Sequence, residues 1–77
     1  MPPILRDNGY RFFFFSDEHL PKHIHIEKGD SYIRIELENF QITHRYKVPQ
    51  KEIKKIIKIV KQKQQILLGA WDEHFKK

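Results

Sequence analysis

Hydrophobic and polar residues follow two different periods along this chain. In the first half, apolar side chains recur at every second position, which is the spacing of a β-strand with one buried face. From Pro49 onward they recur at about 100° per residue, which is the spacing of an amphipathic α-helix. The pattern therefore predicts an α+β domain in which the strands come first and one long helix follows.

Turn signals divide the first half into strands. Asn8-Gly9 is a strong hairpin signal between two apolar runs, and Gly29-Asp30 and Glu38-Asn39 provide two further turns. We expect a four-stranded antiparallel β-meander, grouped as two hairpins plus a further strand. The expected strand residues lie near 3–7, 10–16, 22–28, 31–37 and 40–47.

A long helix is predicted near residues 50–76. Its apolar face carries Ile53, Ile56, Ile57, Val60, Leu67, Leu68, Trp71 and Phe75. The opposite face carries Lys51, Lys54, Lys55, Lys58 and Lys61. We expect this helix to cover the apolar face of the sheet, so that residues 1–77 form a single domain.

Pairing across the predicted turns assigns each strand side chain to one face of the sheet. Around Gly29-Asp30, apolar residues meet apolar residues and His25 faces Arg34. Continued across the next turn, the same register pairs Ile33 with His44 and places His44 on the helix side. The face away from the helix then carries His23, His25, Glu27, Tyr32, Arg34, Glu36 and Arg45.

The run Phe12 to Phe15 breaks the strand alternation and is apolar on both faces. A strand of this kind must be covered on both faces, but one helix can cover only one. Two explanations stay open: a second copy or a partner protein packs there, or the connecting segment Ser16–Pro21 covers two of the four rings.

The net charge of +5 is concentrated in the C-terminal segment. Residues 50–77 hold eight lysines and three acidic residues, while residues 1–49 are balanced. A lysine-rich helix face is commonly just solvated, but it can also bind nucleic-acid phosphates or an acidic partner.

The chain has no cysteine, which fits a reducing cytoplasm. Its N-terminus lacks the apolar stretch of a signal peptide, and its longest apolar run is Phe12 to Phe15. We therefore expect a cytoplasmic protein with no membrane association.

The outward-facing histidines suggest acid and base chemistry on a phosphodiester. His23 and His25 are the catalytic candidates, because imidazole can move a proton near neutral pH. Arg11, Arg34 and Arg45 are phosphate-binding candidates, and Tyr32 can stack on a base. This reading predicts a metal-independent ribonuclease acting on single-stranded RNA.

Two other readings of the same histidines stay open. His23 and His25 form an H-x-H pair that could share a metal ion with His19 or with a carboxylate such as Glu27. No metal or other cofactor is favoured, since an arginine on the facing strand would repel a cation. Alternatively, the histidines are surface polar residues with no chemistry.

Two motifs carry a family resemblance. The opening stretch resembles an ILR-x-x-GYRFFFYS motif, and Pro21, His23, Ile24 and His25 resemble a PPHVHV motif in which Lys22 replaces the second proline. With the C-terminal AWDEHF stretch, they resemble a small bacterial family of domains of unknown function, family 4160. The residues that match its opening motif are Ile4, Leu5, Arg6, Gly9, Tyr10, Arg11 and Phe12 to Phe14.

The resemblance implies a role in a two-gene system. Members of that family tend to be encoded beside another small domain, in an arrangement that resembles a toxin–antitoxin pair with this domain as the toxin. The leading hypothesis is therefore a toxin-like protein that acts on RNA or translation, with a small antitoxin-like partner or a second copy of itself. The rival is a non-catalytic module that binds a protein or nucleic acid, and a metal-dependent enzyme is the third reading.

Overall fold

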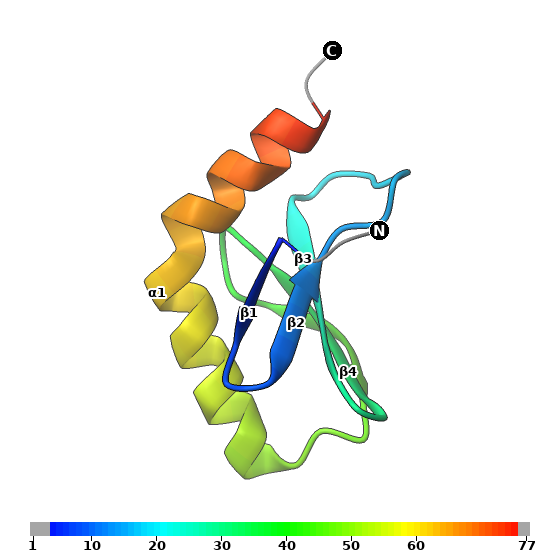
Figure 1. Cartoon of the computed structure of the whole chain (residues 1–77), viewed down its shortest axis with the longest axis vertical. Coiled ribbons are helices and arrows are strands. Elements are labelled where there is room, and N and C mark those ends of the chain that lie inside the picture. Colours follow the sequence, from blue (N-terminus) through cyan, green and yellow to red (C-terminus); the bar gives the residue numbers. More distant parts are fainter. Residues whose placement is uncertain (1–3, 76–77) are drawn as a thin grey trace.

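The structure of the protein is a computed structural model that describes residues 4–75 (Figure 1). Within this range, five strands form one antiparallel sheet in chain order and a helix packs against it. The elements are β1 (Leu5–Asp7), β2 (Tyr10–Phe13), β3 (His23–Lys28), β4 (Ser31–Glu36), β5 (Ile42–Tyr46) and α1 (Gln50–Phe75). The expected strand residue 3 and helical residue 76 lie outside the described residues.

The α+β class and the order of strands before helix are confirmed, but the number of strands is five and not four. Every predicted turn places the next strand directly beside the previous one, so all five segments join a single sheet. At the first turn, Asp7 pairs with Tyr10. Asn8 and Gly9 have φ angles of 53° and 80°, the pair of left-handed conformations that a tight hairpin requires.

The predicted register between β3 and β4 is confirmed along the whole ladder. His23 lies opposite Glu36, and His25 lies opposite Arg34. Because alternate residues of a strand point to opposite faces, both histidines project from the face opposite Ile24. Ile24, which lies between them, and Ile26 project toward the helix and are buried. At the N-terminal end of β3, the His23 ring also contacts Trp71 of α1, at a centroid distance of 5.1 Å.

The predicted register between β4 and β5 is correct at Ile35, which pairs with Ile42, and wrong beyond it. A β-bulge shifts the pairing by one residue, so that Ile33 lies opposite Arg45 and Arg34 lies opposite His44. A one-residue shift moves each following side chain to the other face. Arg45 is therefore on the helix side, and His44 is exposed on the outer face.

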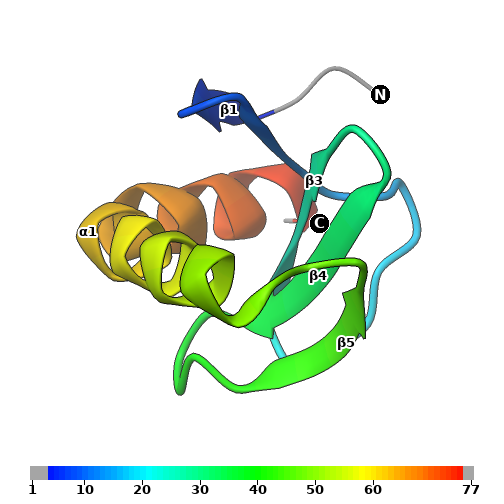
Figure 2. The same cartoon turned by 90° about the horizontal axis from the view of Figure 1, so that it is seen from below.

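The core lies between α1 and one face of the sheet (Figures 1 and 2). It consists of Tyr10, Phe12, Phe14, Ile24, Ile26, Ile33, Ile35, Leu37, Val48, Ile53, Ile56, Ile59, Val60, Leu67 and Trp71. Each fully buried side chain of this size contributes about 1.5–3 kcal/mol to stability. The predicted helix position is thus confirmed.

The run of four phenylalanines is divided between the two faces. Phe12 and Phe14 are fully buried, and the ring of Phe14 packs edge-on against Trp71 of α1. Phe13 points to the outer face and is buried as well, whereas Phe15 remains 52% exposed. The chain therefore covers three of the four rings without a partner.

The lysines of α1 point to solvent as predicted. Lys54, Lys55, Lys58 and Lys61 are exposed along the outer side of the helix. No helix within residues 4–75 combines the length and the apolar character that crossing a membrane requires.

Candidate functional site

His23 and His25 are buried on the outer face of the sheet, with exposures of only 2% and 3%. They are not surface polar residues, so that reading of the pair is wrong. The ring of His25 stacks against Phe13 at a centroid distance of 5.5 Å and contacts Phe15 at 4.4 Å. A polar group buried to this extent needs hydrogen-bond partners from the protein.

Glu18 provides a partner for both histidines. Its Oε1 lies 3.0 Å from Nε2 of His23, and its Oε2 lies 2.6 Å from Nε2 of His25. The backbone N–H of Phe15 also donates to Oε2, at 3.1 Å. The segment between β2 and β3 therefore folds over the outer face and inserts a carboxylate, itself only 7% exposed, between two imidazoles.

The Nδ1 atoms of both histidines also have hydrogen-bond partners in the protein. Nδ1 of His23 donates to the carbonyl oxygen of Pro21 at 2.8 Å. A carbonyl can only accept, so this nitrogen carries a proton. Nδ1 of His25 lies 2.7 Å from the hydroxyl of Tyr32 on β4. Both histidines thus direct Nε2 to one carboxylate and Nδ1 to a fixed neighbour.

Burial, hydrogen bonds and neighbouring charges shift the pKa values of Glu18, His25 and Tyr32. Burial raises the pKa of Glu18, but the hydrogen bonds from Phe15 and His23 and the histidine charges outweigh it, so the net pKa lies below its usual value. Burial lowers the pKa of His25, although Glu18 opposes that shift. Burial also raises the pKa of Tyr32, so its hydroxyl stays protonated. The favoured state has an ionised Glu18 beside a neutral His25.

Arg34 lies beside the cluster of Glu18, His23 and His25 but does not hydrogen-bond to it. Its Nη2 is 3.4 Å from Nδ1 of His23, a nitrogen that already donates to Pro21 and has no lone pair to offer. Its Nε is buried and has no hydrogen-bond partner among the described residues. Arg34 therefore adds positive charge next to the histidines without a direct bond to their rings.

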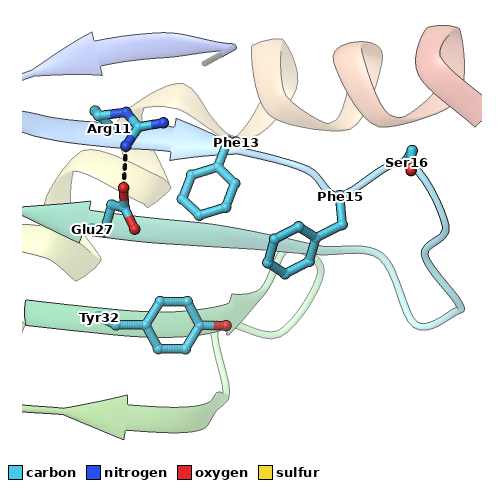
Figure 3. A pocket seen from close by; sticks show the side chains of 6 residues that line it. All are labelled: Arg11, Phe13, Phe15, Ser16, Glu27 and Tyr32. Atoms are coloured by element: carbon cyan, nitrogen blue, oxygen red, sulfur yellow. Dashed lines mark hydrogen bonds and ion pairs between the residues drawn. The ribbon is translucent and has the colours of Figure 1, made fainter. Parts of the chain in front are cut away.

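A pocket of about 490 Å³ adjoins the cluster on the outer face. It is lined by Arg11, Phe13, Phe15, Ser16, Glu27 and Tyr32. Figure 3 shows the three aromatic rings around the pocket, with the ion pair between Arg11 and Glu27 at one end. Tyr32 both lines the pocket and contacts His25, so its hydroxyl connects the pocket to the buried cluster.

The structure brings most of the predicted site residues together. His23, His25 and Tyr32 form one hydrogen-bonded group, Arg34 adjoins it, and Arg11 lies across the pocket. These residues come from β2, β3 and β4, and the confirmed ladder between β3 and β4 places their side chains on one face.

Two predicted residues lie elsewhere. Arg45 donates from Nε to the carbonyl oxygen of Val48 at 3.1 Å on the helix side, because the bulge in β5 reverses its orientation. His19, the expected third histidine of a metal site, is exposed. Glu27, the carboxylate suggested for that site, pairs with Arg11, whereas Glu18 lies between the histidines.

Glu18 is the residue that sequence reasoning missed. It lies in an irregular segment, where no strand or helix period fixes the direction of a side chain. The available signal was indirect: buried histidines require partners, and Glu18 belongs to the segment that one of the two explanations placed over the phenylalanines.

A comparison with protein families matches residues 9–72 to a domain of unknown function (DUF4160). The match spans most of the chain, and this protein belongs to that family. The resemblance seen in the two N-terminal motifs is thereby confirmed. Comparisons with curated proteins and with solved structures gave no significant match. A function must therefore be argued from the site itself.

Proposed function

We propose that this protein binds RNA in the cytoplasm as the toxin-like component of a two-protein system, and that RNA occupies the pocket beside Tyr32. The observation that carries the proposal is the position of the Tyr32 hydroxyl. Tyr32 lines an aromatic pocket, and its hydroxyl is fixed at 2.7 Å from a buried histidine. A hydroxyl held in this way can recognise one polar atom of a ligand.

The pocket offers the contacts that single-stranded RNA uses. The rings of Phe13, Phe15 and Tyr32 provide faces on which a base can stack. The Arg11 side chain is 38% exposed and donates to Glu27 through Nη1, which leaves its other N–H groups available for a phosphate oxygen. Stacking with a charged contact at one end fits a nucleotide better than a purely apolar ligand.

His23 and His25 enter this proposal as positioning residues. Both are buried, and all four of their ring nitrogens have protein partners, so neither reaches the pocket directly. His25 fixes the Tyr32 hydroxyl, and His23 helps to hold Glu18 in place behind it. Tyr32 is the residue that touches RNA.

The protein partner in this two-protein system binds the segment between β2 and β3, which borders the pocket. Phe15 and Leu20 are two large apolar side chains of this segment, with exposures of 52% and 75%. A small antitoxin-like protein that covers them would also close the pocket. A second copy of this chain is the alternative, and the molar mass in solution distinguishes the two.

The RNA proposal is tested by fluorescence anisotropy with a labelled single-stranded RNA. The wild-type protein should bind, and Tyr32→Phe should weaken binding about tenfold, which corresponds to one lost hydrogen bond. Tyr46→Phe is the matched control, because Tyr46 pairs with Tyr32 on the same face and is exposed. Equal affinities for the two variants, or no binding by the wild type, would rule out the pocket as the RNA site.

A second candidate function is a non-catalytic module that binds nucleic acid through α1. The exposed lysines along this helix favour it, because they present one sign of charge over several turns. Charge reversal at Lys54 and Lys58 should then abolish binding, while Tyr32→Phe leaves it unchanged. A steep decrease in affinity with salt would accompany this mode.

A further inference from the structure

We propose that Glu18, His23 and His25 form a binding site for a divalent transition-metal ion of the zinc class. Each residue contributes one ligand atom, and these atoms lie within 4.8 Å of one another. Two imidazoles and a carboxylate are a donor set that suits zinc, iron and other first-row divalent ions. This site is independent of the RNA proposal and can exist without it.

The orientation of the histidine rings is the strongest evidence for a metal site. A metal-binding histidine typically directs one nitrogen at the ion and donates from the other to a carbonyl, carboxylate or water. His23 does this, with Nδ1 donating to Pro21 and Nε2 directed at Glu18. His25 has the same arrangement, with Tyr32 as the partner of Nδ1. Two neighbouring histidines are thus both oriented as ligands.

The distances between the histidines and the carboxylate require only a small adjustment, and all three ligand atoms lie within 4.8 Å of one another. Ligands about 2 Å from a shared tetrahedral ion are about 3.3 Å apart. The Nε2 atoms of His23 and His25 lie 3.0 and 2.6 Å from the two oxygens of Glu18. An ion that replaces the protons between these atoms would therefore push the carboxylate outward by several tenths of an ångström. Glu18 is on an irregular segment, which can accommodate such a shift more easily than a strand.

Charges of both signs lie near the proposed metal site. Glu18 supplies a negative charge within the cluster, and Arg34 supplies a positive charge on the Nδ1 side of His23. Arg34 opposes binding but lies beside the nitrogen that faces away from the carboxylate. Three protein ligands also leave a coordination position for water or substrate, which is the pattern of catalytic and not structural zinc sites.

Metal binding would change the hydrogen bond that reaches the pocket. In the metal-free protein, the ionised Glu18 accepts from Nε2 of His25, and the neutral ring accepts the Tyr32 proton at Nδ1. When Nε2 binds a metal, Nδ1 must carry the proton and donate to the oxygen of Tyr32. The Tyr32 O–H is then released to donate toward the pocket. The ion and the pocket are coupled through one proton position on His25.

The test uses full-length protein without a histidine tag, treated with EDTA and dialysed, and titrated with Zn²⁺ by calorimetry. We expect one ion to bind per chain. Glu18→Gln and His25→Gln should each weaken binding at least about 100-fold, because they remove a ligand. His19→Gln and His44→Gln are the matched controls and should keep the wild-type affinity, since both histidines are exposed and outside the cluster.

A second measurement on the wild type guards against variants that fail to fold. Long-range ¹H–¹⁵N spectra should show Zn²⁺ shifting Nε2 of His23 and His25, with the His25 proton moving from Nε2 to Nδ1. Weak binding that Glu18→Gln leaves unchanged, or shifts confined to His19 and His44, would overturn the proposal. RNA binding is measured separately in EDTA, so that failure of the metal site is distinguished from failure of the RNA proposal.

Discussion

The two halves of the outer sheet face differ in what covers them. On β3, His23 and His25 are buried beneath the segment that carries Phe15 and Glu18. On β5, every residue is exposed, including His44. A histidine points outward in both halves, through strand alternation on β3 and through the bulge on β5. Register therefore only selects a face of the sheet, whereas a segment from elsewhere in the chain turns that face into a site.

A buried polar group lowers stability unless it forms a hydrogen bond, whereas an exposed polar group does not need a protein partner. A buried polar atom without a hydrogen bond costs about 1–3 kcal/mol, while an exposed one is hydrated by water. In the covered half, every ring nitrogen of His23 and His25 and both oxygens of Glu18 have a partner. A fully satisfied network of this kind favours a single arrangement of its side chains. The exposed half has no such constraint.

The largest contrast between the two halves should come from aromatic truncation. Phe13→Ala removes a buried ring that stacks on His25, and it should lower the free energy of unfolding by about 3 kcal/mol. Tyr46→Ala in the exposed half should lower it by less than about 1 kcal/mol. Urea denaturation of both variants measures the difference. Equal losses would mean that the covered half is not packed as described.

A smaller effect is expected from removal of the central carboxylate. Glu18→Ala leaves two buried Nε2 atoms without an acceptor, so in EDTA it should cost about 1–3 kcal/mol of unfolding free energy. Glu38→Ala, at an exposed turn, is the control and should change stability by less than about 0.5 kcal/mol. A Glu18 variant as stable as its control would show that the carboxylate does not pair with the histidines.

The smallest effect concerns the buried Tyr10 on the opposite face of the sheet. Its hydroxyl donates to a single carboxylate, that of Glu52, whereas Glu18 joins two histidines in one network. Burial and the nearby Glu52 raise the pKa of Tyr10 to about 12 from its ordinary value of 10.0. A raised folded-state pKa stabilises the fold below the unfolded value, and this contribution is lost as the pH rises through the folded value. Wild-type stability should therefore decrease between about pH 10 and 12 through this group.

Tyr10→Phe removes the contribution of this hydroxyl to the loss of stability at alkaline pH. Its stability, measured by urea denaturation across this pH range, should decrease less steeply than that of the wild type. Tyr46→Phe is the control for an exposed tyrosine and should follow the wild type. If Tyr10→Phe and the wild type lose stability in parallel, Tyr10 does not contribute to the pH dependence.

Sequence reasoning could predict those parts of the molecule that a period or a turn specifies. The hairpin at Asn8-Gly9, the ladder between β3 and β4, and the helix beginning near Gln50 all follow from such patterns and are confirmed. The two histidines were placed on the correct face for the same reason. Their burial was not predicted, because it depends on a segment outside both strands.

The bulge in β5 and the position of Glu18, which sequence reasoning missed, have a common physical origin. The bulge at β5 inserts Thr43 as an extra residue, and no glycine or turn residue marks it in the sequence. The position of Glu18 depends on how an irregular segment packs against the sheet, which local propensity does not determine. Tertiary contacts decide both features.

The most direct test of the account is a long-range ¹H–¹⁵N spectrum of the histidine rings in EDTA-treated protein. We predict that Nδ1 of His23 donates to Pro21 and that Nε2 of both His23 and His25 donates to Glu18, so that each ring is fixed by its partners. His19 and His44 should instead show the averaged signals of exposed rings that exchange between tautomers. If the signals of His23 and His25 are averaged in the same way, Glu18 does not bridge them and the site described here does not exist.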